Sequence, residues 1–194
     1  MFQKLKSRHD LLEKSLEHTS RRTFVKGVAA ASGVLLLSPW ERLLAKTDER
    51  KLNFYHMHTG ENLSTVYYTD GGYLDGSMQE IEYFLRDFRT DEAHPIDPKL
   101  LDLLSLINEH SGKKSTFEVF SGYRSPKTNN MLRHSSSGVA KRSLHMQGKA
   151  IDIRLKDVSS ADIKKIATSL KQGGVGHYKS SDFVHLDTGR FRTW

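Results

Sequence analysis

The sequence predicts an α+β domain with a small, mostly antiparallel sheet that is flanked by helices. Two observations support this prediction. Apolar residues recur at helical spacing in some segments, and they alternate with period two in several shorter ones. The order along the chain is strands, two helices, two strands, a helix and a last strand. The length of 194 residues and the hydrophobic content of 37% suit one such domain with a terminal segment.

The first forty-five residues predict an export signal that is separate from the folded domain. Arg21 and Arg22 precede a short apolar run over residues 27–37. As a helix this run would rise only about 16 Å, roughly half of a bilayer core, so no stable membrane span is expected. The paired arginines followed by Phe24 resemble a twin-arginine (Tat) signal, and an amphipathic or frayed helix is the alternative.

We therefore expect a twin-arginine-type export signal over residues 1–45, cut near Ala45, and a folded domain over residues 46–194. The expected location is the periplasm or cell envelope, with the Tat export machinery as a partner. Of the net charge of +7, residues 1–45 carry +4, from eight basic and four acidic residues, which leaves +3 for the rest. So small a charge, without a basic stripe that contains aromatic residues, predicts no binding to nucleic acid.

Several regions have the composition and alternation of β-strands. The expected strands are residues 52–59 and 63–69, which form a hairpin around Gly-Glu-Asn, then residues 115–125, which end in a turn at Gly122, and residues 149–155 and 182–189. Within residues 149–155, Ile151 and Ile153 face one side and Asp152 faces the other. In the last strand, His185 and Asp187 share a face.

Helical spacing combines with helix-end signals in three segments. The expected helices are residues 77–88, 97–111 and 159–172. The first begins with Ser77 and Glu80, which have the spacing of a capping box. The second begins with Asp97 as the capping residue and Pro98 in the first turn. Glycines follow the second and third helices and are expected to end them.

His145, Asp152 and His185 are candidate metal ligands. The chain has no cysteine, so a metal would have to use histidine and carboxylate ligands. A catalytic zinc site needs three protein ligands and an open fourth position. If the strands that carry Asp152 and His185 pair, their side chains can meet, and Gly148 would let the chain turn so that His145 faces Asp152. A solvated turn beside a half-exposed carboxylate is the alternative interpretation.

The stretch around these residues matches the pattern S-x-H-x-x-G-x-A-x-D at all its fixed positions, which are Ser143, His145, Gly148, Ala150 and Asp152. This pattern resembles that of the M15 clan of zinc peptidases, which includes D-alanyl-D-alanine carboxypeptidases, bacteriophage endolysins and murein endopeptidases. The upstream Ser-Gly-Tyr-Arg-Ser and the downstream Phe-Val-His-Leu-Asp-Thr-Gly are most similar to the YcbK/MepK-like branch. The resemblance covers residues 50–194.

The resemblance implies Zn²⁺ as the cofactor, with His145, Asp152 and His185 as its ligands, and Arg124 as the group that stabilises the oxyanion on the scissile carbonyl. It implies a zinc-dependent murein endopeptidase that acts on peptidoglycan stem peptides and cross-links, with bonds between two meso-diaminopimelate residues as the expected target. The alternatives are a carboxypeptidase of the same clan that removes terminal D-alanine, and a non-catalytic zinc-containing module that binds peptidoglycan.

The proton-accepting residue is left open between two candidates. Many members of the clan have glutamate three residues before the last histidine ligand, and here that position is Asp182, which is one methylene shorter. His177 is the other candidate. Asp187 could orient His185 or form a structural salt bridge. The residues of one further polar stretch are expected to be structural or cleft-lining: His56, His58 and Glu61.

Overall fold

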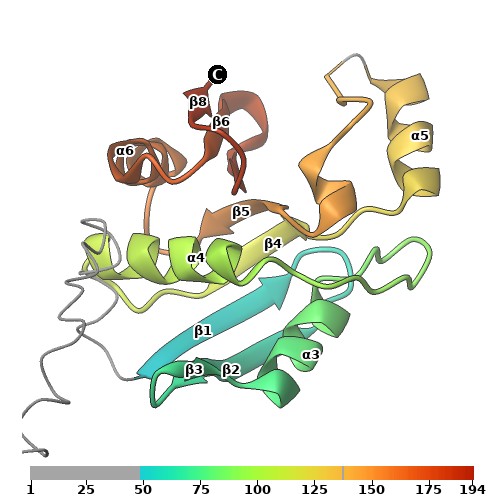
Figure 1. Ribbon diagram of the computed structural model, residues 1–194. Helices are drawn as coiled ribbons and strands as arrows, with labels where there is room; N and C mark the ends of the chain where they lie inside the picture. Colours follow the sequence, from blue (N-terminus) through green and yellow to red (C-terminus); the bar gives the residue numbers. More distant parts are fainter. Residues whose placement is uncertain (1–48, 137) are drawn as a thin grey trace, which may run out of the picture. The chain divides into compact units, whose positions relative to one another are not determined.

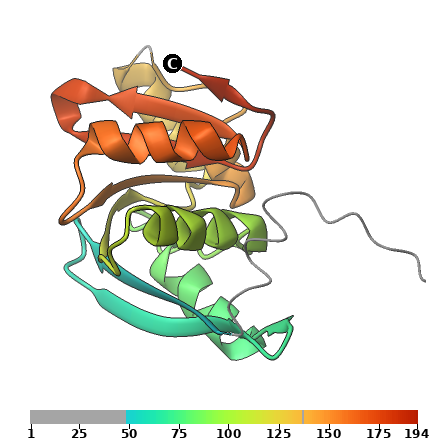
Figure 2. The ribbon, with the colours of Figure 1, turned by 90° about the vertical axis from the view of Figure 1, so that its left-hand side faces the viewer.

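The computed structural model describes residues 49–136 and 138–194, and Figures 1 and 2 show them from two directions. The described residues belong to one compact unit. The expected export signal over residues 1–45, with its cut near Ala45, lies outside the described residues and stays a prediction. Within the described part, no helix combines the length and the apolar character that crossing a bilayer requires.

An eight-stranded sheet forms the centre of the described chain. Its strands are β1 (Glu49–His56), β2 (Asn62–Thr69), β3 (Gly72–Tyr73), β4 (Phe117–Ser121), β5 (Ala150–Leu155), β6 (Gly174–Tyr178), β7 (Phe183–Asp187) and β8 (Arg192–Thr193). Their order in space is β3-β2-β1-β4-β5-β7-β6-β8. β1 is parallel to β4 and β6 is parallel to β8, while the other neighbours are antiparallel. The mostly antiparallel sheet and the β1–β2 hairpin are therefore confirmed.

Helices flank this sheet, as predicted. In the described part of the chain they are α3 (Asp75–Phe84), α4 (Pro98–His110), α5 (Pro126–Ser135) and α6 (Ser160–Leu170), with the short 3₁₀ helices η1 (Leu144–Gln147) and η2 (Lys179–Ser181). α3 contacts β2, α4 contacts β1, and α6 contacts β5, β6 and β7. In Figure 2, α4 and α6 lie next to each other along the sheet.

The apolar core fixes the register of the central strands. Ile151 and Ile153 of β5 and Val184 of β7 are fully buried on the side of the sheet that α6 contacts. Burying a side chain of this size contributes about 1.5–3 kcal/mol. Because a slip of one residue would exchange the two faces of a strand, this core holds Asp152 and His185 on the opposite face. The candidate site lies on that face, beside η1.

The capping box predicted at Ser77 is wrong, because the helix begins two residues earlier. α3 starts at Asp75, and the capping position before it is Leu74, which makes no side-chain cap hydrogen bond. The carboxylate of Asp75 in the first turn is favourable beside the positive end of the helix dipole. Glu80 instead accepts a hydrogen bond from the Thr65 hydroxyl of β2 at 3.3 Å. Packing against the sheet, rather than a local cap, therefore determines this helix start.

The same helix also ends earlier than predicted, at Phe84 rather than at Phe88. The chain leaves the helix at Leu85, whose carbonyl accepts the N–H of Tyr123 at 2.7 Å in the loop that follows β4. Phe88 lies outside the helix and stacks on His58, with the ring centroids 4.3 Å apart. The apolar character of Phe88 thus serves the packing of a loop.

The other two predicted helices are confirmed, but the glycine stop expected after the third is wrong, because α6 ends at Leu170 and the residue in the left-handed conformation is Lys171, with a φ of +54°. The side chain of Asp97 accepts the N–H of Lys99 at the start of α4. The side chain of Ser159 accepts the N–H of Asp162 at the start of α6. Gly112 follows α4 with a φ of +66°, in the left-handed region that glycine favours.

Two elements near the site go beyond the sequence prediction. α5 is poor in apolar residues, although Ser125 precedes Pro126 in the way that a capping residue precedes a first-turn proline, and the Ser125 side chain accepts the N–H of Thr128. β6 contains Gly174 and Gly176, and glycine is depleted in strands. Local propensity therefore opposes β6, and its pairing with β7 and β8 decides the outcome.

Candidate metal centre

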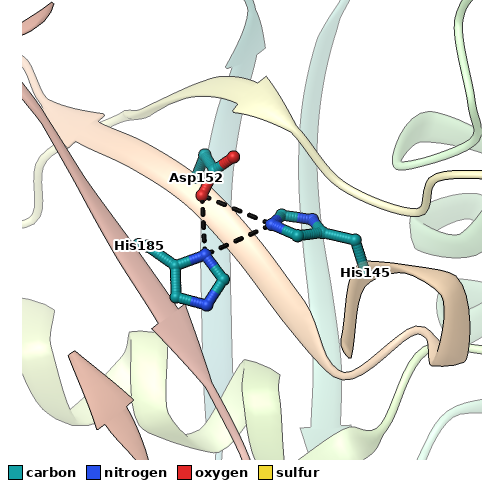
Figure 3. A group of neighbouring side chains, drawn as sticks. All are labelled: His145, Asp152 and His185. Carbon is teal, nitrogen blue, oxygen red and sulfur yellow. Dashed lines mark hydrogen bonds and ion pairs between the residues drawn. The ribbon is translucent and has the colours of Figure 1, made fainter. Parts of the chain in front are cut away.

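His145, Asp152 and His185 come together on the face of the sheet beside η1, as Figure 3 shows. β5 pairs with β7 so that Asp152 lies directly opposite His185. Nδ1 of His185 lies 2.8 Å from Oδ1 of Asp152. Nε2 of His145 lies 3.2 Å from Nδ1 of His185 and 3.4 Å from Oδ1 of Asp152. One atom of each residue therefore faces a common point.

The short helix η1 brings His145 back towards β5. Its cap is Ser143, whose hydroxyl accepts the N–H of His145 at 3.4 Å. Gly148 ends η1 with a φ of +63°, a conformation that glycine adopts without steric cost. A Cβ at this position would also collide with the carbonyl oxygen of Pro95. The turn expected at Gly148 is therefore confirmed, and glycine is needed there for two reasons.

A backbone carbonyl determines which nitrogen of His145 faces the centre. Nδ1 of His145 lies 2.7 Å from the carbonyl oxygen of Gly122. A carbonyl can only accept a hydrogen bond, so Nδ1 carries the hydrogen and Nε2 presents its lone pair. Gly122 itself fits closely against Leu85, because a Cβ on it would approach the Leu85 carbonyl oxygen to 2.5 Å. The loop after β4 thus fixes the tautomer of His145.

A carboxylate performs the same function for His185. Nε2 of His185 lies 3.0 Å from Oδ2 of Asp187, so Nδ1 is the nitrogen that faces Asp152. Asp187 is fully buried and also pairs with Arg192 at 2.7 Å. The sequence left open whether Asp187 orients the histidine or forms a structural salt bridge, and the structure shows both contacts. A carboxylate behind a histidine is a common support of metal sites.

The charges of the centre favour a cation between its carboxylates. Burial would raise the pKa of Asp152, but the neighbouring His145 and His185 outweigh it and hold that pKa well below its usual range. Burial would lower the pKa of His185, but hydrogen bonds to Asp152 and Asp187 raise it to about 9. Either a proton or a metal ion therefore gains stabilisation at Nδ1 of His185, and a metal has to displace the proton.

The three side chains fit a tetrahedral metal ion. Their ligand atoms all lie within 4.8 Å of one another. Ligands held about 2.0–2.1 Å from a tetrahedral zinc ion lie about 3.3 Å apart. The two contacts of His145 Nε2 measure 3.2 and 3.4 Å, and the third distance, from His185 Nδ1 to Asp152 Oδ1, is shorter at 2.8 Å because a hydrogen bond joins these atoms. Two imidazole nitrogens and one carboxylate oxygen form a donor set that zinc accepts. These residues could hold the ion and leave its fourth position open to the cavity beside them.

This cavity has a basic and aromatic wall. In addition to the three residues of the centre, its lining includes Arg124, Arg142, Tyr178, Phe183 and Trp194. Among the described residues that line it, Asp152 is the one carboxylate. The cavity therefore presents hydrogen-bond donors and aromatic surface to a bound molecule, and its acidic group is already engaged with the two histidines.

Arg124 lies next to the centre, where it contacts Asp152. Its Nη2 atom is 3.4 Å from Oδ2 of Asp152 and 3.2 Å from the hydroxyl of Ser121. The side chain is only 11% exposed, and its Nε atom has no hydrogen-bond partner among the described residues. Burial lowers the pKa of Arg124, and the adjacent Asp152 partly offsets this effect. The structure thus brings Arg124 to the wall of the cavity, beside Asp152.

The two candidates for the proton-accepting residue lie elsewhere. Asp182 follows η2, does not line the cavity, and is 57% exposed; its carboxylate accepts the hydroxyl of Ser160 at 2.6 Å and contacts Arg154 at 3.4 Å. His177 pairs in register with Val184, on the buried side of β7, and its Nε2 lies 3.1 Å from Ser160. Neither residue is brought together with the three residues of the centre.

The stretch that contains His56 and His58 contacts its own turn. Nδ1 of His56 accepts the N–H groups of His58 and Thr59. Burial lowers the pKa of His56 to about 4, so the ring stays neutral. Glu61 forms an ion pair with Arg86 at 3.1 Å. These contacts stabilise the turn between β1 and β2, and none of the three predicted residues lines the cavity.

The similarity of this chain to known proteins covers all residues of the candidate centre. A family model described as peptidoglycan L,D-endopeptidase MepK matches residues 44–194. The peptidoglycan L,D-endopeptidase MepK of Escherichia coli (strain K12) is 36% identical over 174 residues, which cover 90% of this chain and 96% of that protein. A Haemophilus influenzae protein named "Probable peptidoglycan L,D-endopeptidase MepK" is 42% identical over 146 residues, which cover 75% of this chain and 78% of that protein.

Proposed function

The chain belongs to the M15 peptidase family described as peptidoglycan L,D-endopeptidase MepK, and on that premise we propose that it is a zinc-dependent murein endopeptidase. Its substrates are the peptide cross-links of peptidoglycan, and it acts in the periplasm or cell envelope. The names of its relatives support this substrate. The observation that carries the proposal is the convergence of His145, Asp152 and His185 on one cavity.

Zinc held by three protein ligands with a free fourth position lowers the pKa of a bound water towards ~7 and polarises a carbonyl group. The chain's own residues hold the substrate and balance its charge. Arg124 donates to the scissile carbonyl oxygen as negative charge develops there. Asp152 supports both tasks, because Oδ1 faces the two histidines while Oδ2 holds the guanidinium of Arg124.

The test of this function is digestion of defined cross-linked muropeptides by the full chain loaded with zinc, read by mass spectrometry. We expect cross-linked dimers to be converted to monomers, and we expect a chelator to stop the reaction and added zinc to restore it. Release of D-alanine alone would identify a carboxypeptidase. Retention of the muropeptide on the protein without any product would identify a binding module.

Replacing Asp187 with asparagine is expected to weaken zinc binding by about 10- to 100-fold, the range found for carboxylates that support a ligand histidine. An amide at this position removes the charge that faces His185 Nε2 and Arg192. Competition with a chromophoric chelator measures the affinity. The matched control is Asp162→Asn, which changes an exposed carboxylate on α6; equal affinities in the two variants would contradict the supporting role.

The role of Asp182 as proton acceptor stays a prediction, and it requires the side chain to change its contacts. To reach the cavity, its carboxylate would have to leave Ser160 and Arg154. If Asp182 takes the proton, Asp182→Asn lowers kcat by about 10²- to 10⁴-fold at unchanged zinc content. Wild-type kcat in this variant would remove Asp182 from the mechanism and would leave the metal centre and Arg124 in place.

A further inference from the structure

Trp194 forms the part of the cavity wall that lies against His185. The centroid of its indole is 5.3 Å from that of the imidazole. The indole lies over Gly176, where a Cβ would come within 2.6 Å of the ring atom Cε2. The main-chain N–H of Trp194 donates to the carbonyl of Val175, and the main-chain carbonyl of Trp194 accepts the N–H of His177. Backbone pairing and the missing side chain at Gly176 together place the indole, which is 48% exposed, against β6.

Tyr178 stands next to Trp194 in the same wall. The register of β6 and β7 places Tyr178 opposite Phe183, on the face that carries His185. Its ring stacks on Phe183, with centroids 4.6 Å apart and an angle of 14°. The indole N–H of Trp194 donates to the phenolic oxygen at 3.3 Å. Because the phenol accepts this bond, its own hydrogen points elsewhere, and no described residue accepts it.

Arg124 faces the same space from another side. Tyr178 and Arg124 both line the cavity, and Nη2 of Arg124 lies 3.4 Å from Oδ2 of Asp152. Arg124 and Tyr178, whose hydroxyl has no acceptor among the described residues, thus both line the cavity that contains the three residues of the centre.

We propose that Tyr178 is a second hydrogen-bond donor to the scissile carbonyl oxygen, alongside Arg124, and that Trp194 is the positioning residue that directs its hydroxyl. This inference rests on the proposed function. The hydroxyl keeps its proton, and its hydrogen bond becomes shorter and stronger as the carbonyl oxygen acquires negative charge. Trp194 acts through Tyr178. Its indole N–H donates to a lone pair of the phenolic oxygen, and this hydrogen bond directs the O–H of Tyr178 away from the indole.

The first test is the variant Tyr178→Phe in the full chain loaded with zinc. It keeps the ring that stacks on Phe183 and removes only the hydroxyl. We expect kcat on a cross-linked muropeptide to fall about 10- to 100-fold with little change in KM, zinc content or melting temperature. The matched control is Tyr83→Phe, which alters a tyrosine of α3 that is 59% exposed and does not line the cavity; it should keep the wild-type kcat.

A phosphinate analogue of the cross-link gives a measurement that does not depend on turnover. Its tetrahedral, anionic phosphorus group imitates the developing oxyanion, so Tyr178→Phe should weaken its binding by the same factor that it lowers kcat/KM. After a chelator has removed the metal, the wild type and Tyr178→Phe should bind the intact muropeptide with equal affinity. In the otherwise wild-type chain, Trp194→Phe should lower kcat by a smaller factor than Tyr178→Phe does. In a chain that already carries Tyr178→Phe, Trp194→Phe should cause no further loss of kcat.

The outcomes separate the inference from the function on which it rests. Wild-type kcat and phosphinate affinity in Tyr178→Phe would overturn the role of Tyr178 while the wild type still cleaves. An equal loss from Trp194→Phe in both backgrounds would overturn the positioning role of Trp194. A wild-type chain that neither cleaves the muropeptide nor binds the phosphinate would overturn the proposed function and this inference with it.

Discussion

Replacing His145 with alanine is expected to reduce the release of muropeptide monomers by more than about 1,000-fold, well beyond the 10- to 100-fold expected for a residue that only supports a ligand. The variant removes one of three convergent ligand atoms, and the two that remain cannot hold the geometry of a catalytic zinc site. Zinc retained after dialysis should fall from one ion per chain towards zero, as measured by atomic absorption.

Two controls separate loss of metal from loss of fold in this experiment. His134→Ala changes an exposed histidine of α5 and should keep full activity. The melting temperature of the wild type should rise on addition of zinc, because a ligand that binds only the folded state stabilises it. That of His145→Ala should not respond. Unchanged cleavage in His145→Ala would refute the zinc-hydrolase proposal as a whole.

Arg124→Lys is expected to lower kcat by about 10²- to 10³-fold, the cost found for removing one donor from an oxyanion site. Lysine keeps the charge but loses the planar fork, so it cannot contact Asp152 and Ser121 and still donate to the cavity. KM and zinc content should change little. The measurement is steady-state cleavage of a defined cross-linked muropeptide.

The matched control for this substitution is Arg133→Lys, on an exposed position of α5 that does not line the cavity. Its activity should equal that of the wild type. If Arg124→Lys raised KM and left kcat unchanged, Arg124 would bind the substrate and the transition state equally well, and the oxyanion role would have to be abandoned.

Strand alternation in the sequence anticipates the positions of two of the three candidate metal ligands, Asp152 and His185. Asp152 alternates with the buried Ile151 and Ile153, so it has to face away from the core. His185 occupies the corresponding place in β7. Once two antiparallel strands pair, such residues meet without any further information. Gly148 could likewise be expected at a tight turn, since its left-handed conformation is one that glycine favours.

The support of Arg124 could not be anticipated, because it comes from a distant part of the chain. Ser125 donates its N–H at 2.9 Å to the buried carboxylate of Asp87, which lies 38 residues earlier. Gly122 packs on Leu85 in the same region. These contacts also end α3 before its predicted end. No pattern within a helix or a strand reports a contact between two loops so far apart.

The aromatic wall of Tyr178, Phe183 and Trp194 could not be predicted from the sequence for a different physical reason. Strand propensity argues against β6, and the glycine that lowers it is the one that makes room for the indole of Trp194. Had β6 been expected as a strand, Tyr178 would have shared a face with Gly176 and would have been a candidate cavity residue. The glycine was a signal for the close approach of another group rather than for a loop.

The groups that orient the two histidines of the candidate centre differ in how far a substitution can change them. His185 takes its orientation from the side chain of Asp187, which a single codon change can replace, so its basicity is open to gradual tuning. His145 takes its orientation from the main-chain oxygen of Gly122, which every amino acid possesses. Mutation can move that oxygen but cannot alter its chemistry. Substitution can therefore change the chemical group that orients His185, whereas the group that orients His145 remains a main-chain carbonyl whatever residue stands there.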